Sequence, residues 1–132
     1  LIALTAPATG APLLQAPVPA CLDAVVLGMG TDGHTASLFP GGDSLADAFA
    51  PDAPRLLAVR APGAPEPRIT LSLPAILAAQ ALFLHVEGAA KHAALRHALA
   101  AGPVDDMPVR AVLRQTTRPV ALFTQPQPGT PE

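Results

Sequence analysis

The chain has 132 residues, 50% of them apolar, a formal net charge of −2 and no run of consecutive lysines or arginines. This composition indicates a folded domain, lacks the basic footprint of nucleic-acid or acidic-membrane binding, and contains no stretch near the roughly 20 apolar residues of a membrane span. A single cysteine, Cys21, rules out an internal disulfide, so we expect a core or strand-edge thiol in a cytoplasmic protein.

The first half of the chain is organised around residues 24–42. Residues 1–4 predict a short strand, and residues 5–20, rich in proline, alanine, threonine and glycine, predict a loop. Val25, Val26 and Leu27 then predict a buried strand that runs into a polar, glycine-rich loop. Open α/β sheets place their ligands in loops at the carboxyl ends of such strands.

Short elements follow this loop. Ser44 is expected to cap a helix over residues 45–49, and residues 56–59 form an apolar run that predicts a second strand. The proline-rich residues 61–67 predict an extended connection to Arg68. Residues 68–73 alternate apolar and polar, as a half-buried strand does, and Pro74 is expected at the first position of a helix over residues 75–80.

The second half predicts further strands and helices in alternation. Residues 81–86 are apolar on both faces, which favours parallel pairing inside a sheet. Residues 89–102 predict the longest helix, and residues 108–115 and 119–124 predict a short helix and a last strand. The expected apolar positions of the longest helix are Ala93, Ala94, Leu95, Ala98 and Leu99. The pattern predicts one α/β domain over residues 1–125 and a flexible tail at 126–132.

The glycines of the first loop allow a dinucleotide fold to be considered. Gly28, Gly30 and Gly33 satisfy G-x-G-x-x-G after a strand. That fingerprint requires a full helix after the third glycine, whereas a proline and two glycines follow at residues 40–42. The acidic residue expected at the end of the next strand is also missing, because that run ends in Arg60. The loop therefore fits nicotinamide binding poorly.

Asp32 and His34 are the chemically distinctive pair of the loop. A spacing of two in a turning loop lets both side chains lean over one site, and histidine is suited to proton transfer near neutral pH. An aspartate in a loop also commonly stabilises the turn itself. The residues alone therefore indicate a small-molecule site and leave a structural and a catalytic role for the pair open.

Three ordered motifs resemble those of the 6-phosphogluconolactonases. They are GMGTDGHTASLFPG at residues 28–41, APGAPEPRITLSLPAI at 61–76 and HVEGAAK at 85–91, and the resemblance is close over residues 23–91. It implies a Rossmann-like three-layer sandwich with a mostly parallel sheet. It also implies hydrolysis of the lactone of 6-phosphogluconate in the oxidative pentose phosphate pathway, with a sugar-phosphate lactone as substrate and no metal or organic cofactor.

The resemblance also assigns roles to single residues. His34 is expected to be the general base that activates water, with Asp32 orienting it or binding sugar hydroxyls. Arg68 and Lys91 match the positions expected to meet the substrate phosphate. The other residues expected to contact substrate are Gly28, Gly30, Gly33 and Thr35, and the backbone N–H groups of Gly28 and Gly30 are candidates for stabilising an oxyanion.

Two alternatives remain beside the lactonase. Glucosamine-6-phosphate deaminases resemble this family but carry a glutamate five residues after the histidine, where this chain has Phe39. A non-catalytic sugar-phosphate-binding fragment is the other alternative, because nothing before Cys21 matches the phosphate loop of the family's amino-terminal part. We therefore expect about the carboxyl-terminal half of the enzyme, a missing amino-terminal half or self-association through an exposed apolar sheet edge or face, and an activity of this chain alone that the sequence leaves open.

Overall fold

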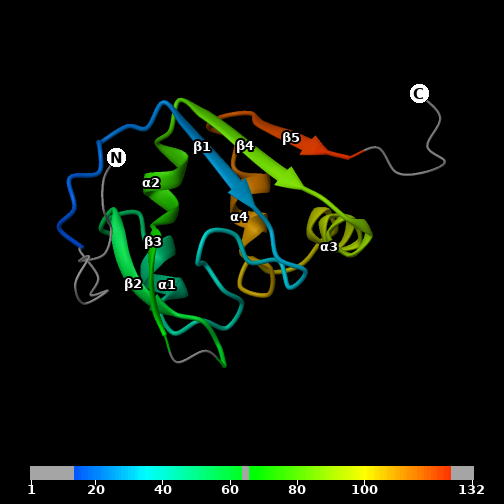
Figure 1. Ribbon diagram of the computed structural model, residues 1–132, viewed down its shortest axis with the longest axis horizontal. Helices are drawn as coiled ribbons and strands as arrows, with labels where there is room; N and C mark the ends of the chain where they lie inside the picture. Colours follow the sequence, from blue (N-terminus) through cyan, green and yellow to red (C-terminus); the bar gives the residue numbers. More distant parts are fainter. Residues whose placement is uncertain (1–13, 64–65, 126–132) are drawn as a thin grey trace.

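The computed structural model describes residues 14–63 and 66–125 of the chain. The strand predicted at residues 1–4 and the tail predicted at 126–132 lie outside the described residues. All the other predicted helices and strands are present, in the predicted order (Figure 1). They are β1 (Ala24–Gly28), α1 (Leu45–Phe49), β2 (Leu56–Arg60), β3 (Pro67–Leu71), α2 (Leu73–Leu77), β4 (Ala81–Val86), α3 (Ala89–Leu99), α4 (Val109–Arg114) and β5 (Val120–Thr124).

A parallel sheet of three strands forms the centre of the structure. β4 lies between β1 and β5 and pairs in parallel with both, so that Val26, Phe83 and Ala121 are neighbours across the sheet. Figure 1 shows the three strands side by side, with α3 beyond the carboxyl end of β4. The parallel pairing predicted for residues 81–86 is confirmed, and with it the α/β class of the fold.

β2 and β3 form a separate antiparallel pair. Their register joins Leu56 to Leu71 and Arg60 to Pro67. The connection between them is too short for the crossover that parallel strands need, so this pair does not follow the strand–helix alternation of the other elements. The hairpin nevertheless contributes to the site below, because β3 carries Arg68 and Thr70.

One face of the parallel sheet carries the hydrophobic core. Alternate residues of a strand point to opposite faces, and the buried set faces the helices. Ile76 of α2 and Val109 and Val112 of α4 are fully buried against this face. The sheet residues in the same cluster are Val25, Leu27, Leu82, Leu84 and Val86. These contacts fix the carboxyl ends of β1 and β4, from which the site is built.

The opposite face of the sheet is open within the described residues. Val26 is 71% exposed and Phe123 is 55% exposed, and the rings of Phe83 and Phe123 lie 5.9 Å apart on this face. Residues 81–86 are thus apolar on both faces, although only one of them is covered by helices. The sequence predicted an exposed apolar edge or face, and these side chains form one.

Two helix starts differ in detail from the sequence predictions. Ser44 occupies the N-cap of α1 but makes no side-chain capping bond, because its hydroxyl donates to Asp43 Oδ1 at 3.2 Å. α2 begins at Leu73, one residue before Pro74, and its N-cap is Ser72. The Ser72 hydroxyl accepts the Ala75 N–H at 3.4 Å, so the capping serine lies before α2 rather than before α1.

Two further expectations about packing were only partly met. α3 buries Ala94, Leu95 and Ala98, but Ala93 and Leu99, predicted to be core positions, are exposed, Leu99 by 63%. The buried three lie at positions i, i+1 and i+4, a narrower stripe than the sequence suggested. Cys21 is also exposed rather than buried, and its thiol donates to the Ala78 carbonyl at 3.0 Å.

Candidate functional site

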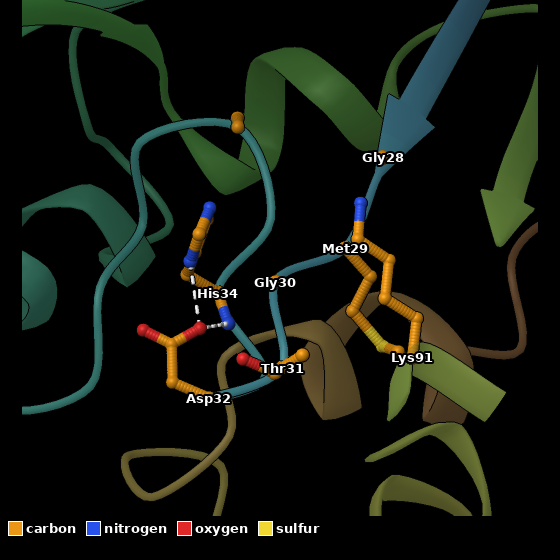
Figure 2. Close-up of a pocket in the computed structure, with 8 residues that line it drawn as sticks. Gly28, Met29, Gly30, Thr31, Asp32, His34 and Lys91 are labelled. Atoms are coloured by element: carbon orange, nitrogen blue, oxygen red, sulfur yellow. Dashed lines mark hydrogen bonds and ion pairs between the residues drawn. The ribbon is translucent and has the colours of Figure 1, made fainter. Parts of the chain in front are cut away.

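The loop that leaves β1 forms an open pocket of about 640 Å³ at the carboxyl end of the parallel sheet (Figure 2). The loop begins here because β1 pairs in parallel with β4 and ends at Gly28, at the carboxyl edge of the sheet. The lining residues come from the loop and from α3. They are Gly28, Met29, Gly30, Thr31, Asp32, His34, Ala36 and Lys91. The pocket thus contains five of the eight residues predicted for the site, namely Gly28, Gly30, Asp32, His34 and Lys91.

Two hydrogen bonds join Asp32 and His34 in this pocket. Asp32 Oδ1 accepts a hydrogen bond from the His34 backbone N–H at 3.1 Å and lies 2.7 Å from Nδ1 of the His34 ring. Partial burial opposes ionisation of Asp32, but the bonds from His34 outweigh it and hold the pKa of Asp32 below its ordinary value. Asp32 is therefore ionised near neutral pH.

The ionised carboxylate determines what the histidine can do. Because a carboxylate only accepts hydrogen bonds, Nδ1 must donate to it. In a neutral imidazole the other nitrogen, Nε2, then carries the lone pair, and Figure 2 shows this nitrogen pointing away from Asp32. The His34 side chain is 34% exposed, so solvent reaches it. This arrangement suits a general base that takes a proton through Nε2 while Asp32 stabilises the resulting imidazolium.

Gly30 is required by the geometry of the pair. A Cβ atom at this position would lie 2.2 Å from His34 Nδ1 and 2.4 Å from Asp32 Oδ1, inside the hydrogen bond that joins them. The Gly30 N–H donates to the His34 carbonyl at 2.9 Å and closes the loop. That N–H, a candidate for stabilising the oxyanion, is engaged in this bond, and the contact of Gly30 with substrate stays a prediction.

Gly33 connects the loop to α4. Its backbone has a φ of +84°, and a Cβ there would lie 2.7 Å from Cβ of Met107. The Gly33 carbonyl accepts the N–H of Val109 at 2.9 Å. Gly33 lies outside the pocket lining and packs against Met107, and its contact with substrate stays a prediction. The third glycine of the motif therefore fixes the loop on the core.

Thr35 has a structural role that the sequence did not predict. Its side chain is completely buried, and its hydroxyl donates to the Gly28 carbonyl at 2.8 Å. The hydroxyl is thus already bonded to the backbone, and the contact of Thr35 with substrate stays a prediction. Ser37 makes a second connection, because its N–H donates to Thr70 Oγ1 on β3 at 3.2 Å. The two bonds anchor the loop to β1 and to the hairpin.

The two cations predicted to bind phosphate lie in different places. Lys91, in the first turn of α3, lines the pocket, and in the view of Figure 2 its side chain and His34 flank Gly30. Arg68 is exposed on β3 and does not line the pocket. Its guanidinium carbon lies 5.4 Å from the ring centre of Phe39, whose ring centre lies 4.8 Å from that of His34. The structure therefore brings Lys91 to the pocket directly and Arg68 near His34 only through Phe39.

Sequence reasoning missed three residues of the site. Met29 and Ala36 line the pocket, and Ala36 has a φ of 49°, which is uncommon for a residue with a side chain. Phe39 packs on His34 but was considered only as a departure from the deaminase pattern. Its signal in the sequence is the apolar Leu38-Phe39 pair at the end of a loop that is otherwise small or polar.

The described residues give no metal centre. Across residues 14–63 and 66–125, no three histidine, cysteine, aspartate or glutamate side chains converge as metal ligands do. In the same part of the chain, no helix has the length and apolar character needed to cross a membrane.

Comparison with protein families gives a match over most of the chain. The model of the family described as "Glucosamine-6-phosphate isomerases/6-phosphogluconolactonase" matches residues 5–121. A 6-phosphogluconolactonase of Rhizobium meliloti is 47% identical over 106 residues, which are 80% of this chain and 46% of that protein. One of Mesorhizobium japonicum is 49% identical over 110 residues, 83% of this chain and 45% of that protein. The chain thus spans about half the length of the curated relatives it matches.

A solved structure gives the same match in three dimensions. The crystal structure of a 6-phosphogluconolactonase from Shewanella baltica superposes with a TM-score of 0.73 at 45% sequence identity. The superposition covers 77% of this chain and 43% of that one. The described fold is therefore that of a part of such a protein.

Proposed function

This chain belongs to the family of glucosamine-6-phosphate isomerases and 6-phosphogluconolactonases, and we propose that the whole protein hydrolyses the lactone of 6-phosphogluconate. The single observation that carries the proposal is the Asp32–His34 pair in an open pocket, with the Nδ1 to Oδ1 distance of 2.7 Å. The names of the relatives support the substrate. The orientation of the His34 ring supports the chemistry described next.

In the proposed mechanism, His34 acts as the general base. Nε2 takes a proton from a water molecule while the water oxygen attacks the lactone carbonyl carbon, and the carbonyl electrons move to its oxygen. When these electrons return, the bond from the carbonyl carbon to the ring oxygen breaks. The imidazolium then gives its proton to the departing ring oxygen, which becomes a hydroxyl group. Asp32 stabilises the imidazolium between the two proton transfers, and such assistance accelerates reactions by about 10²–10⁴-fold.

Lys91 supplies the proposed phosphate contact in the pocket. Its ammonium lies on a flexible stem in the first turn of α3, where the partial positive charge of the helix end also favours an anion. Charge-assisted hydrogen bonds to phosphate contribute about 1.5–3 kcal/mol each. We assign Arg68 to the rim of the same site, next to the Phe39 ring that packs near His34.

Phe39 supports the lactonase over the deaminase. The resemblance implies a glutamate at this position in the deaminases, where it assists ring opening together with the histidine. Here an aromatic ring lies 4.8 Å from the His34 ring and is only 8% exposed, so His34 has an apolar neighbour in place of an acid. Asp32 is then the carboxylate that acts with His34.

The test follows lactone disappearance above the spontaneous rate, with the full-length protein. We expect His34→Ala to lower the enzymatic rate by about 10²–10⁴-fold. His97→Ala is the matched control, because His97 is exposed on α3 outside the pocket, and it should retain the wild-type rate. Equal rates for wild type and His34→Ala would remove His34 from the mechanism. Release of ammonia from glucosamine 6-phosphate would favour the deaminase, and binding of the lactone without turnover would favour a non-catalytic site.

A further inference from the structure

Phe39 is the residue through which two separate parts of the site meet. Its ring centre lies 4.8 Å from that of His34, with the ring planes tilted by 44°. The guanidinium carbon of Arg68 lies 5.4 Å from the same ring centre. The buried Phe39 ring therefore lies next to both the proposed base, His34, and the exposed cation of β3, Arg68.

The hydrogen bond that the His34 ring donates to Asp32 fixes only part of the orientation of His34. It holds one ring nitrogen, and a single bond leaves the imidazole free to rock about the axis through its Cβ and Cγ atoms. Packing of a neighbouring ring against the imidazole restricts that motion, because the two rings cannot overlap. Phe39 is in place to provide this second constraint, since its own ring is held in the core with 8% exposure.

Arg68 reaches Phe39 because of the register of β3. Alternate residues of a strand share a face, so Arg68 and Thr70 point to the same side of β3. Thr70 on that side accepts the Ser37 N–H at 3.2 Å, two residues before Phe39 in the chain. Across residues 14–63 and 66–125, Arg68 has no carboxylate within salt-bridge distance. The ring of Phe39 is thus the contact that holds the cation near the loop.

We propose that Phe39 is a positioning residue, whose ring both fixes the plane of the His34 imidazole and holds the Arg68 guanidinium at the rim of the pocket. This inference rests on the proposed lactonase function. It assigns Phe39 two separable effects, because the orientation of His34 determines the rate of proton transfer and the placement of Arg68 determines binding of the substrate phosphate. Phe39 itself does not line the pocket.

Substitutions of Phe39 in the full-length protein separate the ring from its volume. Phe39→Met keeps most of the volume without the ring and should lower kcat by about 10–100-fold through misorientation of His34. It should also raise KM by about two- to fivefold, through the lost contact with Arg68. Phe39→Tyr keeps the ring and should remain within about threefold of wild type in both constants. The matched control is Phe123→Met, the same change at a ring of β5 outside the pocket, which should alter neither.

Arg68→Gln adds the second arm of the test. Because Arg68 is exposed, this variant keeps the fold, and it should raise KM with little change in kcat. In the Phe39→Met background the same substitution should have no further effect on KM, since the ring that placed the guanidinium is gone. A full additional increase there would show that Arg68 is held independently of Phe39, which would overturn the proposal.

NMR of the His34 ring protons tests the positioning without any turnover. Removal of a ring at 4.8 Å removes its ring-current shift, so Phe39→Met should move these signals. Arg68→Gln should move them in the wild-type background and not in Phe39→Met. Unchanged signals in both single variants overturn the proposal, as does a loss of kcat in Phe39→Tyr equal to that in Phe39→Met. If Phe39→Met fails to fold, the Arg68→Gln spectrum decides alone.

A wild-type protein without lactonase activity would refute the proposed function, while the spectra would still decide whether Phe39 positions His34 and Arg68.

Discussion

The pocket loop and the open face of the parallel sheet lie next to each other in the sequence but differ in how their side chains and backbone groups are satisfied. Val26, on the open face, is two residues before Gly28, where the pocket begins. In the loop, the polar groups of Gly30, His34 and Thr35 find their partners within residues 28–35. The open face instead presents apolar side chains that no described element covers. The geometry of the Asp32–His34 pair is therefore encoded locally, whereas the covering of the sheet depends on contacts of longer range.

The largest effect is expected from a methyl group placed inside the loop. Gly30→Ala introduces a Cβ 2.2 Å from His34 Nδ1 and must separate His34 from Asp32. We expect the lactonase rate of the full-length protein to fall by about 100-fold or more, with a much smaller change in the unfolding midpoint. Kinetics and urea unfolding measured on the same preparation check this. A rate within threefold of wild type would mean that the Asp32–His34 geometry does not govern catalysis.

A methyl group at Gly33 should affect stability first. The left-handed backbone at φ +84° and the Met107 side chain 2.7 Å from the new Cβ together predict a loss of about 2–4 kcal/mol in the free energy of unfolding. Gly41→Ala is the matched control, because Gly41 has a φ of +63° but open space around its Cβ. It should lose only the backbone part, about 1–2 kcal/mol. Equal losses at the two positions would exclude the Met107 contact as a cause.

We expect the open face of the sheet to affect self-association of the chain more than its free energy of unfolding. Val26→Thr combined with Phe123→Thr replaces two exposed apolar side chains and should reduce self-association of the 132-residue chain in sedimentation experiments. Each change should alter the free energy of unfolding by no more than about 0.5 kcal/mol. Val25→Thr, on the covered face with 8% exposure, is the contrasting variant and should cost about 1–3 kcal/mol. Unchanged association in the double variant would show that this face does not join copies of the chain.

The sequence predicted the elements well because their signals are local. Apolar runs, two-residue alternation and glycine or proline punctuation depend on neighbours along the chain, and they located every helix and strand within residues 14–63 and 66–125. The pairing of Asp32 with His34 was also predictable, since two residues two positions apart in a turn must lie close together. The motifs then supplied the family.

Contacts between distant segments were the part that the sequence did not predict. Thr35 was expected to face substrate, but the direction of its hydroxyl is set by the position of the Gly28 carbonyl at the end of β1. The neighbour of Arg68 depends on how the β2–β3 hairpin sits beside the loop, which no periodicity describes. Residues 81–86 are apolar on both faces, so their pattern does not indicate which face the helices cover. The placement of the helices decides this.

The smallest effect is expected from the titration of Asp32. A carboxyl whose pKa is lower in the folded than in the unfolded chain stabilises the fold above its unfolded pKa, and this contribution is lost as the pH falls through the folded value. The pKa of Asp32 is lowered from its ordinary 3.8, so the stability advantage of wild type over Asp32→Asn should be constant near neutral pH and shrink below about pH 4. Because the Asp32 side chain is 53% exposed, solvent screening keeps this difference small.

Urea unfolding of both proteins between neutral pH and acid measures this difference. Asp52→Asn, at an exposed turn, controls for the loss of one negative charge. A difference between wild type and Asp32→Asn that is unchanged at low pH would mean that the carboxylate charge contributes nothing to the fold. The bond to His34 would then serve only to orient the imidazole.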